Sequence, residues 1–171
     1  VKILNCSLNT SHRYIRTYYA RMYEAKFLMG AIAGAMAENG QLAYIADYPI
    51  FGTIANINAF ALGAKMVNPR AQIYLEWSTL KDVDLGIAMD NVIKKGVTVV
   101  SGRDMVIPED ASRYFGLYHI EKEGPRNLAM PLWHWGKFYE QLIRTIMDGT
   151  WKYDDNKDET KAINYWWGLS A

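Results

Sequence analysis

Short apolar runs typical of β-strands alternate with longer helical segments along the chain, and this alternation limits its fold more than any other feature. The expected strands cover residues 1–6, 42–46, 72–77, 97–102, 113–120 and 127–132. The expected helices cover residues 14–38, 51–66, 81–96 and 135–147. Because helical crossovers connect neighbouring strands in parallel, the sequence predicts an α/β fold, a doubly wound parallel sheet. We expect residues 1–171 to form one such lobe.

Two glycines in the longest predicted helix, Gly30 and Gly34, lie one turn apart. Glycine has no Cβ, so the pair lets another element approach the helix backbone closely. We expect the 14–38 helix to pack on the sheet through these glycines, and Asn39-Gly40 to end it.

The composition excludes several classes of partner. The chain has 19 basic and 18 acidic side chains, which leaves no basic surface for nucleic acid or anionic lipid. Its single cysteine, Cys6, excludes an internal disulfide, and we interpret it as a buried strand residue rather than a lipid-attachment site. The opening residues lack a signal-peptide pattern, and the longest apolar run, residues 27–37, is too short to span a bilayer. We therefore expect this chain itself to be soluble.

Motifs of catalysis and of metal binding are absent from the sequence. It contains no GxGxxG or GxxxxGK[ST] phosphate loop and no GxSxG nucleophile elbow. The three histidines, His12, His119 and His134, do not have the close spacing of metal ligands. The sequence therefore predicts a binding protein that is not an enzyme and that needs no cofactor and no metal ion.

Aromatic and acidic residues follow the predicted strands, at the carboxyl ends where ligands bind in such sheets. These residues are Tyr48, Phe51, Trp77, Asp104, Glu121 and Trp133. Their side chains suit a flat small molecule that forms hydrogen bonds. An acid pair of Asp104 and Glu121 is an alternative, but no nucleophile or base partner is evident. We interpret each carboxylate as a hydrogen-bond acceptor for a loop or a ligand hydroxyl.

Four segments together resemble one known family. They are YYARMYEAKFLMGAIAG at 18–34, AYIADYPIFGTIANINAFALGAKMVNPRAQIYLEW at 43–77, WHWGKFYEQLIRTIMDGTWK at 133–152 and YWWGLSA at 165–171. They are similar to segments of the basic membrane protein family, the substrate-binding lipoproteins of ABC importers that include the purine nucleoside receptors. The matches extend over nearly the whole chain.

The resemblance implies a type I periplasmic-binding-protein fold, in which two α/β lobes enclose a ligand cleft. The matching segments form the second lobe of the family, so this chain resembles a C-terminal lobe without the first one. The implied ligand is a purine base or nucleoside, and the implied partner is an ABC permease. The implied location is extracytoplasmic, with the full-length protein anchored to the cell membrane as a lipoprotein.

The resemblance also assigns roles to single residues. Tyr48 and Phe51 stand in a loop that borders the cleft. Trp77 leads into a loop that reads WSTLKD here, with Leu80 where the family often has an aromatic that stacks on the base. Trp133 stands where the family has Lys or Trp, and a Trp there stacks on a ring. We expect Trp135 to be a core residue instead.

One region departs from the family. Residues 101–125 are shorter than their counterparts and contain Pro108. In this region His119, Glu121 and Glu123 replace an aspartate pair that binds ribose hydroxyls in the family. A ribose-specific contact is therefore not implied.

Two further interpretations stay open. The same fold serves as the ligand-sensing domain of transcription and signalling proteins, and fusion to a DNA-binding or signalling segment would distinguish that role from transport. An isolated second lobe would expose an apolar cleft wall, which favours a homodimer that covers it.

Overall fold

The computed structural model describes residues 2–6, 15–79, 84–104, 114–151 and 165–169. The chain divides into two compact units. One unit consists of Val1–Ala20 with Trp133–Ala171, and the other is Arg21–Leu132. Among the described residues, no helix combines the length and the apolar character that a membrane crossing requires.

The larger unit contains a five-stranded sheet with the order β4-β3-β5-β6-β7. Its strands are β3 (Gln41–Ala46), β4 (Gln72–Trp77), β5 (Val99–Ser101), β6 (Leu117–Glu121) and β7 (Gly124–Ala129). Strands β4, β3 and β5 run parallel, as the sequence predicted. The α/β class is therefore confirmed.

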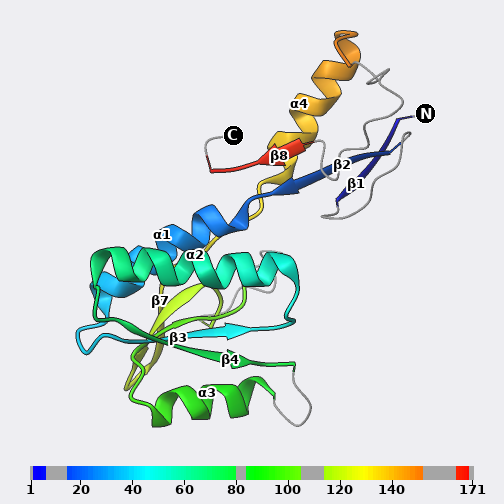
Figure 1. Ribbon diagram of the computed structural model, residues 1–171. Helices are drawn as coiled ribbons and strands as arrows, with labels where there is room; N and C mark the ends of the chain where they lie inside the picture. The colour runs from blue at the N-terminus through cyan, green and yellow to red at the C-terminus, as the bar shows by residue number, and fades with distance from the viewer. Residues whose placement is uncertain (1, 7–14, 80–83, 105–113, 152–164, 170–171) are drawn as a thin grey trace. The chain divides into compact units, whose positions relative to one another are not determined.

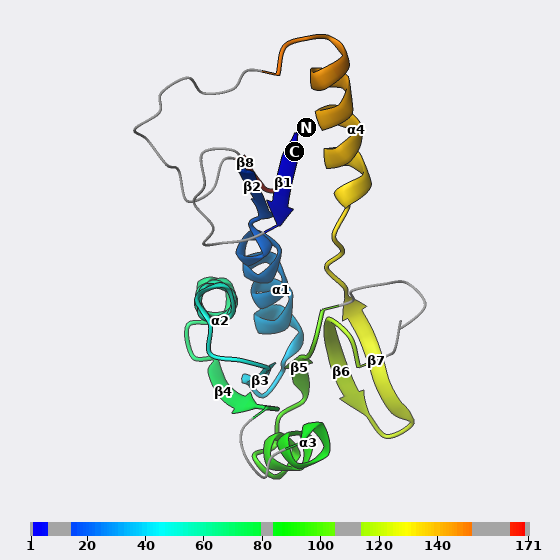
Figure 2. The ribbon, with the colours of Figure 1, turned by 90° about the vertical axis from the view of Figure 1, so that its right-hand side faces the viewer.

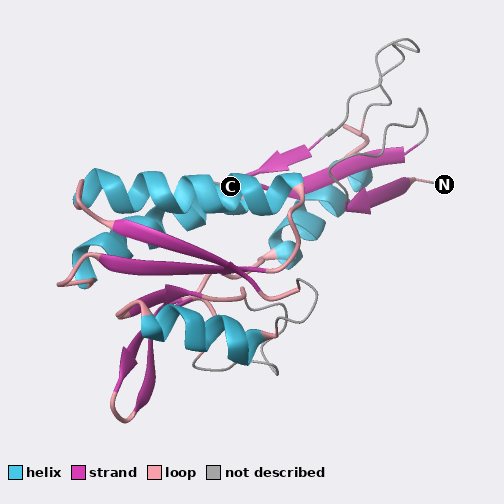
Figure 3. Cartoon of the chain, turned by 60° about the horizontal axis from the view of Figure 1, so that its bottom comes forward, coloured by secondary structure: helices cyan, strands magenta, loops and turns pink. Residues whose placement is uncertain are grey.

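Helices cover both faces of this sheet (Figures 1 and 3). They are α1 (Met22–Met36), α2 (Phe51–Val67) and α3 (Leu85–Lys94). Because side chains of a strand alternate between faces, Leu42 and Tyr44 pack under α1 and α2, whereas Ala43 and Ile45 pack against α3. The two resulting cores make this unit a three-layer sandwich.

Helices α1 and α2 cross in backbone contact. A Cβ added at Gly30 would lie 2.0 Å from the carbonyl oxygen of Phe60, and one at Gly63 would lie 2.0 Å from that of Phe27. At Gly34 the nearest atom would be the carbonyl oxygen of Ala64, at 2.6 Å. The glycines therefore permit close packing, as expected, but the element that they meet is α2 and not the sheet.

The prediction of parallel strands throughout is wrong for β6 and β7, which both run antiparallel to their neighbours. Only Lys122 and Glu123 connect β6 to β7, and so short a link forces a hairpin. Gly124, at the start of β7, has a φ of +114°, which a residue with a side chain rarely adopts. The hairpin thus ends the sheet with an antiparallel extension.

The smaller unit contains a parallel three-stranded sheet with the order β1-β2-β8. Its elements are β1 (Ile3–Cys6), β2 (Ile15–Ala20), β8 (Tyr165–Trp167) and the helix α4 (Trp135–Met147). The predictions of the first strand and of α4 are confirmed. Cys6, however, is exposed rather than buried.

The predicted helix from residue 14 to residue 38 is wrong in its first third, because Ile15–Ala20 forms β2. This run, IRTYYA, contains the β-branched and aromatic residues that strands favour. It pairs with β1 on one side and with β8 on the other. These contacts over long sequence separations override the helical spacing, and α1 begins only at Met22.

Candidate functional site

Three parallel strands of the larger unit end side by side. Ala46, the last residue of β3, pairs with Trp77, the last residue of β4, and Tyr44 of β3 pairs with Ser101, the last residue of β5. The segments that follow therefore begin at the same end of the sheet, which we call the carboxyl end. This is where ligands bind in sheets with parallel strands.

The loops after β3 and β4 are tied together at the carboxyl end. The backbone N–H of Ser78 donates to the carbonyl oxygen of Ala46 at 2.8 Å. The Ser78 hydroxyl donates to Oδ1 of Asp47 at 2.8 Å, and the Thr79 hydroxyl donates to the Asp47 carbonyl oxygen. These bonds fix the position of the Asp47 carboxylate.

A buried lysine reaches the same end of the sheet from α1. Lys26 is 1% exposed, and its Nζ donates to Oδ1 of Asp104 and, at 3.4 Å, to the hydroxyl of Ser101. The Nζ atom also lies 5.2 Å from the centre of the Tyr44 ring, within the range of a cation–π contact. The carboxylate, the hydroxyl and the ring compensate for the burial of the ammonium group.

The electrostatics of this group follow from its burial. Burial raises the pKa of Asp104 above its usual value of 3.8, Lys26 opposes that rise, and Asp47 adds to it. Burial also raises the pKa of Tyr44, with further contributions from Asp104 and Asp47, so the phenol stays neutral. We call Lys26, Tyr44, Asp47, Ser101 and Asp104 the carboxyl-end cluster. Its two carboxylates can accept hydrogen bonds from N–H and O–H groups.

Two predicted site residues, Tyr48 and Phe51, lie next to this cluster along the chain, directly after β3. Their side chains are 61% and 74% exposed. Trp77 differs from them, because it is half-buried and packs against the core under α1 and α2. The structure thus leaves Tyr48 and Phe51 accessible to a flat ligand and gives Trp77 a packing role as well.

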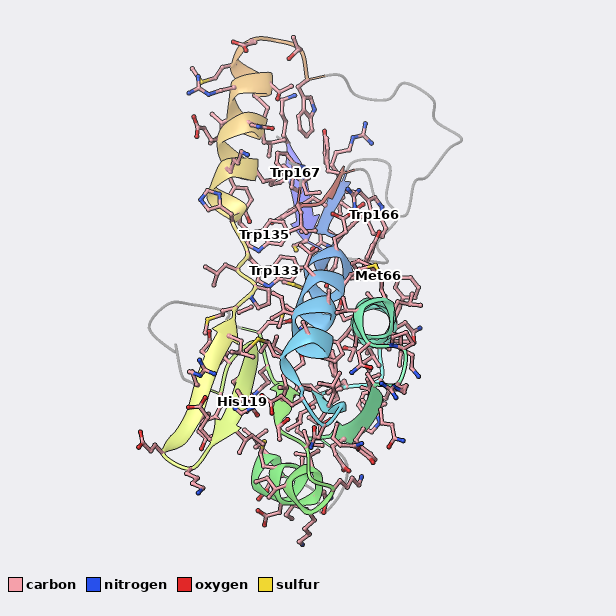
Figure 4. The ribbon with its side chains drawn as sticks, turned by 90° about the vertical axis from the view of Figure 1, so that its left-hand side faces the viewer. Met66, His119, Trp133, Trp135, Trp166 and Trp167 are labelled. Atoms are coloured by element: carbon pink, nitrogen blue, oxygen red, sulfur yellow. The ribbon has the colours of Figure 1, made fainter. Side chains whose placement is uncertain are left out.

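Glu121 lies at the other end of the sheet, because β6 is antiparallel. Leu117 pairs with Ser101, so the strand begins at the carboxyl end and Glu121 comes four residues further away. The Glu121 carboxylate accepts a hydrogen bond from Nε of Arg126 at 2.6 Å and lies 3.5 Å from Nδ1 of His119, a residue that Figure 4 labels. The prediction that Glu121 lies with the other strand ends is wrong, and an acid pair with Asp104 is excluded.

Trp133 and Trp135 belong to the smaller unit and stack on each other (Figure 4). Their ring centres are 5.1 Å apart, with an angle of 6° between the planes. Trp133 also meets Tyr19 edge to face at 5.9 Å, and Trp135 meets Tyr18 at 5.4 Å and Phe138 at 6.3 Å. Both tryptophans are half-buried members of one aromatic cluster, so Trp135 occupies one face of Trp133.

Sequence reasoning missed Lys26, although the sequence contains a signal for it. Lys26 is the only charged residue between Glu24 and Glu38. It lies four residues after Met22 and three before Met29, on the helix face that both methionines bury. A single lysine on the apolar face of a helix indicates a buried charge that needs a partner.

Known proteins resemble this chain in sequence. A sequence model of the family described as "ABC transporter substrate-binding protein PnrA-like" matches residues 9–108. The putative ABC transporter glucose-binding protein TsgA13 of Haloferax volcanii is 29% identical in an alignment of 147 positions that covers 80% of this chain and 38% of that protein. A purine-binding protein of Brucella abortus is 28% identical in an alignment of 165 positions that covers 89% of this chain and 44% of that protein. The chain spans less than half the length of these curated relatives.

Among solved structures, a solute-binding protein of an ABC transporter system from Conexibacter woesei superposes with a TM-score of 0.43 and 16% sequence identity. The superposition covers 52% of this chain and 30% of the other.

Proposed function

Because the chain belongs to the PnrA-like family of ABC transporter substrate-binding proteins, we propose that it binds a planar small molecule such as a purine base or nucleoside, without turnover, for import. The proposed binding surface within the larger unit is the carboxyl end of its sheet. Tyr48 and Phe51 provide rings for stacking there, and Asp47 and Asp104 provide acceptors for hydrogen bonds. Trp77, at the end of β4, packs against the core under α1 and α2.

The observation that carries the proposal is the meeting of acids and exposed aromatics at one end of the sheet. The Asp47 and Asp104 carboxylates lie close enough to interact, because Asp47 adds to the rise that burial causes in the pKa of Asp104. A purine base presents flat faces together with N–H donors at its edge, and such a ligand uses both kinds of side chain.

The names of the relatives point to two ligand classes. One is named as a purine-binding protein and the other as a putative glucose-binding protein. Both ligands donate hydrogen bonds to carboxylates, but a purine gains more from two exposed aromatic rings. The exposure of Tyr48 and Phe51 therefore favours a planar ring over a sugar.

The proposal also includes the full-length protein, its location and its partner. Residues 1–171 correspond to the C-terminal lobe of a two-lobe protein, which agrees with the share of the relatives that the chain spans. Trp133 belongs to the smaller unit, where it stacks on Trp135, and its stacking on a ligand stays a prediction from the family resemblance. The full-length protein is an extracytoplasmic lipoprotein, and its partner is an ABC permease.

Isothermal titration calorimetry tests the proposal directly. The chain is titrated with adenine, adenosine and glucose. We expect saturable binding of adenine or adenosine and weaker or no binding of glucose. Phe51→Ala is expected to reduce the affinity by about 1–3 kcal/mol, the usual contribution of a stacking aromatic.

Met66→Ala is the matched control. Met66 lies near the other end of α2 and is 63% exposed (Figure 4). Met66→Ala is expected to leave the affinity unchanged. Equal losses in both variants, or unchanged affinity in Phe51→Ala, would rule out stacking on Phe51. Tight binding of glucose alone would contradict the purine proposal.

A further inference from the structure

Lys26 is the most deeply buried charged residue among those that the structure describes, and its position raises the question of what it does. We propose that Lys26 is a positioning residue for ligand binding, which holds the Asp104 carboxylate ionised and oriented so that its second oxygen accepts a hydrogen bond from an N–H or O–H group of the ligand. This inference rests on the proposed function, because it needs a ligand at the carboxyl end of the sheet.

The difference in burial between the two partners separates their roles. The Lys26 side chain is 1% exposed, whereas that of Asp104 is 22% exposed. Only the aspartate can therefore touch a ligand. Among the described residues Lys26 is the one hydrogen-bond donor to the Asp104 carboxylate, and it uses Oδ1. Within the described part of the chain Oδ2 accepts no hydrogen bond, so it can accept one from a ligand.

The surroundings of Lys26 determine where its ammonium group lies. Its helix cannot shift easily, because Gly30, one turn further on, lies against the backbone of Phe60. The Ser101 hydroxyl and the face of Tyr44 hold the ammonium group on the side where β3 and β5 end. The lysine therefore presents its charge to the first residues after β5.

Stability alone does not account for a lysine at this position. Replacing a buried ion pair by apolar residues of similar volume often leaves a protein as stable or makes it more stable. Lys26 is buried on α1 together with Met29, and its ammonium group lies over the ring of Tyr44; Met29 and Tyr44 both belong to the apolar core under α1 and α2. An apolar residue at position 26 would suit that core. The ammonium group of Lys26 therefore has a role other than stability.

The charged and titratable groups around Asp104 determine how its pKa changes when Lys26 is removed. Among the described residues they are Lys26 on α1, Tyr44 on β3 and Asp47 after β3, with Arg103 the neighbour in sequence. Lys26 lowers the pKa of Asp104, whereas Asp47 raises it. Without Lys26 the aspartate therefore protonates at a higher pH, and a protonated carboxyl no longer offers a charged acceptor.

The test measures adenosine binding to the full chain by calorimetry over a range of pH. In the wild type we expect affinity to fall as the pH drops through the pKa of Asp104. Lys26→Met is expected to move this midpoint upward by about one pH unit or more. It should also weaken binding near neutral pH about tenfold, because the Asp104 carboxylate loses the charge-assisted hydrogen bond from Lys26 that orients it. Lys26→Arg keeps a positive charge and is expected to restore most of the wild-type profile.

Two further variants separate positioning from structure. Lys65→Met, on the exposed side of α2, is the matched control and should keep the wild-type midpoint. Asp104→Asn does not remove the buried cation and is expected to bind weakly with no such midpoint. If Lys26→Met fails to fold, Asp104→Asn still tests whether the Asp104 carboxylate takes part in binding. A wild-type profile in Asp104→Asn would overturn the inference.

The outcomes also distinguish this inference from the proposed function. If the wild type binds neither purines nor sugars, the proposed function fails and this inference fails with it. If the wild type binds adenosine and Lys26→Met folds with an unchanged midpoint, only the role of Lys26 is overturned. A lower melting temperature with the wild-type midpoint would mean that Lys26 is purely structural.

Discussion

The two ends of the five-stranded sheet each carry a carboxylate paired with a cation, but they differ in burial. At the carboxyl end, Asp104 pairs with Lys26, which is 1% exposed. At the opposite end, Glu121 pairs with Arg126, and their side chains are 38% and 58% exposed. Figure 2 shows the β6–β7 hairpin that carries the exposed pair. The same chemical pairing therefore has different consequences, because solvent screens one pair and not the other.

The largest expected effect comes from breaking the buried pair. Lys26→Met leaves Asp104 without its positive partner and should lower the free energy of unfolding by about 3 kcal/mol. This value is near the lower end for buried pairs, since Asp104 keeps some contact with solvent. Urea denaturation followed by circular dichroism measures it. A loss below about 1 kcal/mol would show that this pair behaves like a surface pair.

A double-mutant cycle sharpens that result. Lys26→Met combined with Asp104→Asn removes both charges together. We expect the double variant to be more stable than the sum of the single effects predicts, by about 1–3 kcal/mol. Additive losses would contradict a direct interaction between the two side chains.

The pH dependence of stability is the next effect in size. The folded state raises the pKa of Asp104, chiefly through burial, so it binds the proton more tightly than the unfolded state does. The stability that this preference provides is present below the usual value of 3.8 and is lost as the pH rises through the higher folded pKa. The free energy of unfolding, measured at several pH values against Asp104→Asn, should therefore fall relative to that variant as the pH rises. A relative gain would mean that Lys26 outweighs burial.

The smallest effect is expected at the exposed pair. Arg126→Met removes the hydrogen bond from Nε to Glu121, but water replaces it readily. The free energy of unfolding should change by less than about 1 kcal/mol, and the affinity for ligand should not change. The same denaturation and calorimetry experiments provide the comparison with Lys26→Met. A loss as large as that of Lys26→Met would remove the distinction between the two ends.

Local patterns in the sequence predicted much of the fold. The strand at Gln41–Ala46 and the helix at Trp135–Met147 lie where their periodicity placed them. The strand at Ile15–Ala20 did not follow its local pattern, because pairing with β1 and β8 decides its state. The direction of β6 also depends on a partner, namely the hairpin with β7, and cannot be predicted from the residues of β6 alone.

The candidate site was predicted in part for the same reasons. Asp104, Tyr48 and Phe51 follow strands that run parallel and end at the same end of the sheet, as the rule for carboxyl ends assumes, and their role in binding stays a prediction. Glu121 was misplaced because the rule assumes a parallel strand. Lys26 was overlooked because its partner, Asp104, is distant in sequence, and only the fold brings the two charges together.

We propose that a planar solute binds at the carboxyl end of this sheet. The most direct measurement is a titration of the ¹⁵N-labelled chain with adenosine, followed by the amide resonances. We expect saturable shifts at Asp47, Tyr48, Ser78 and Asp104, with none at the hairpin residues from Glu121 to Gly124. Shifts confined to the hairpin, or no shifts up to millimolar adenosine, would contradict it.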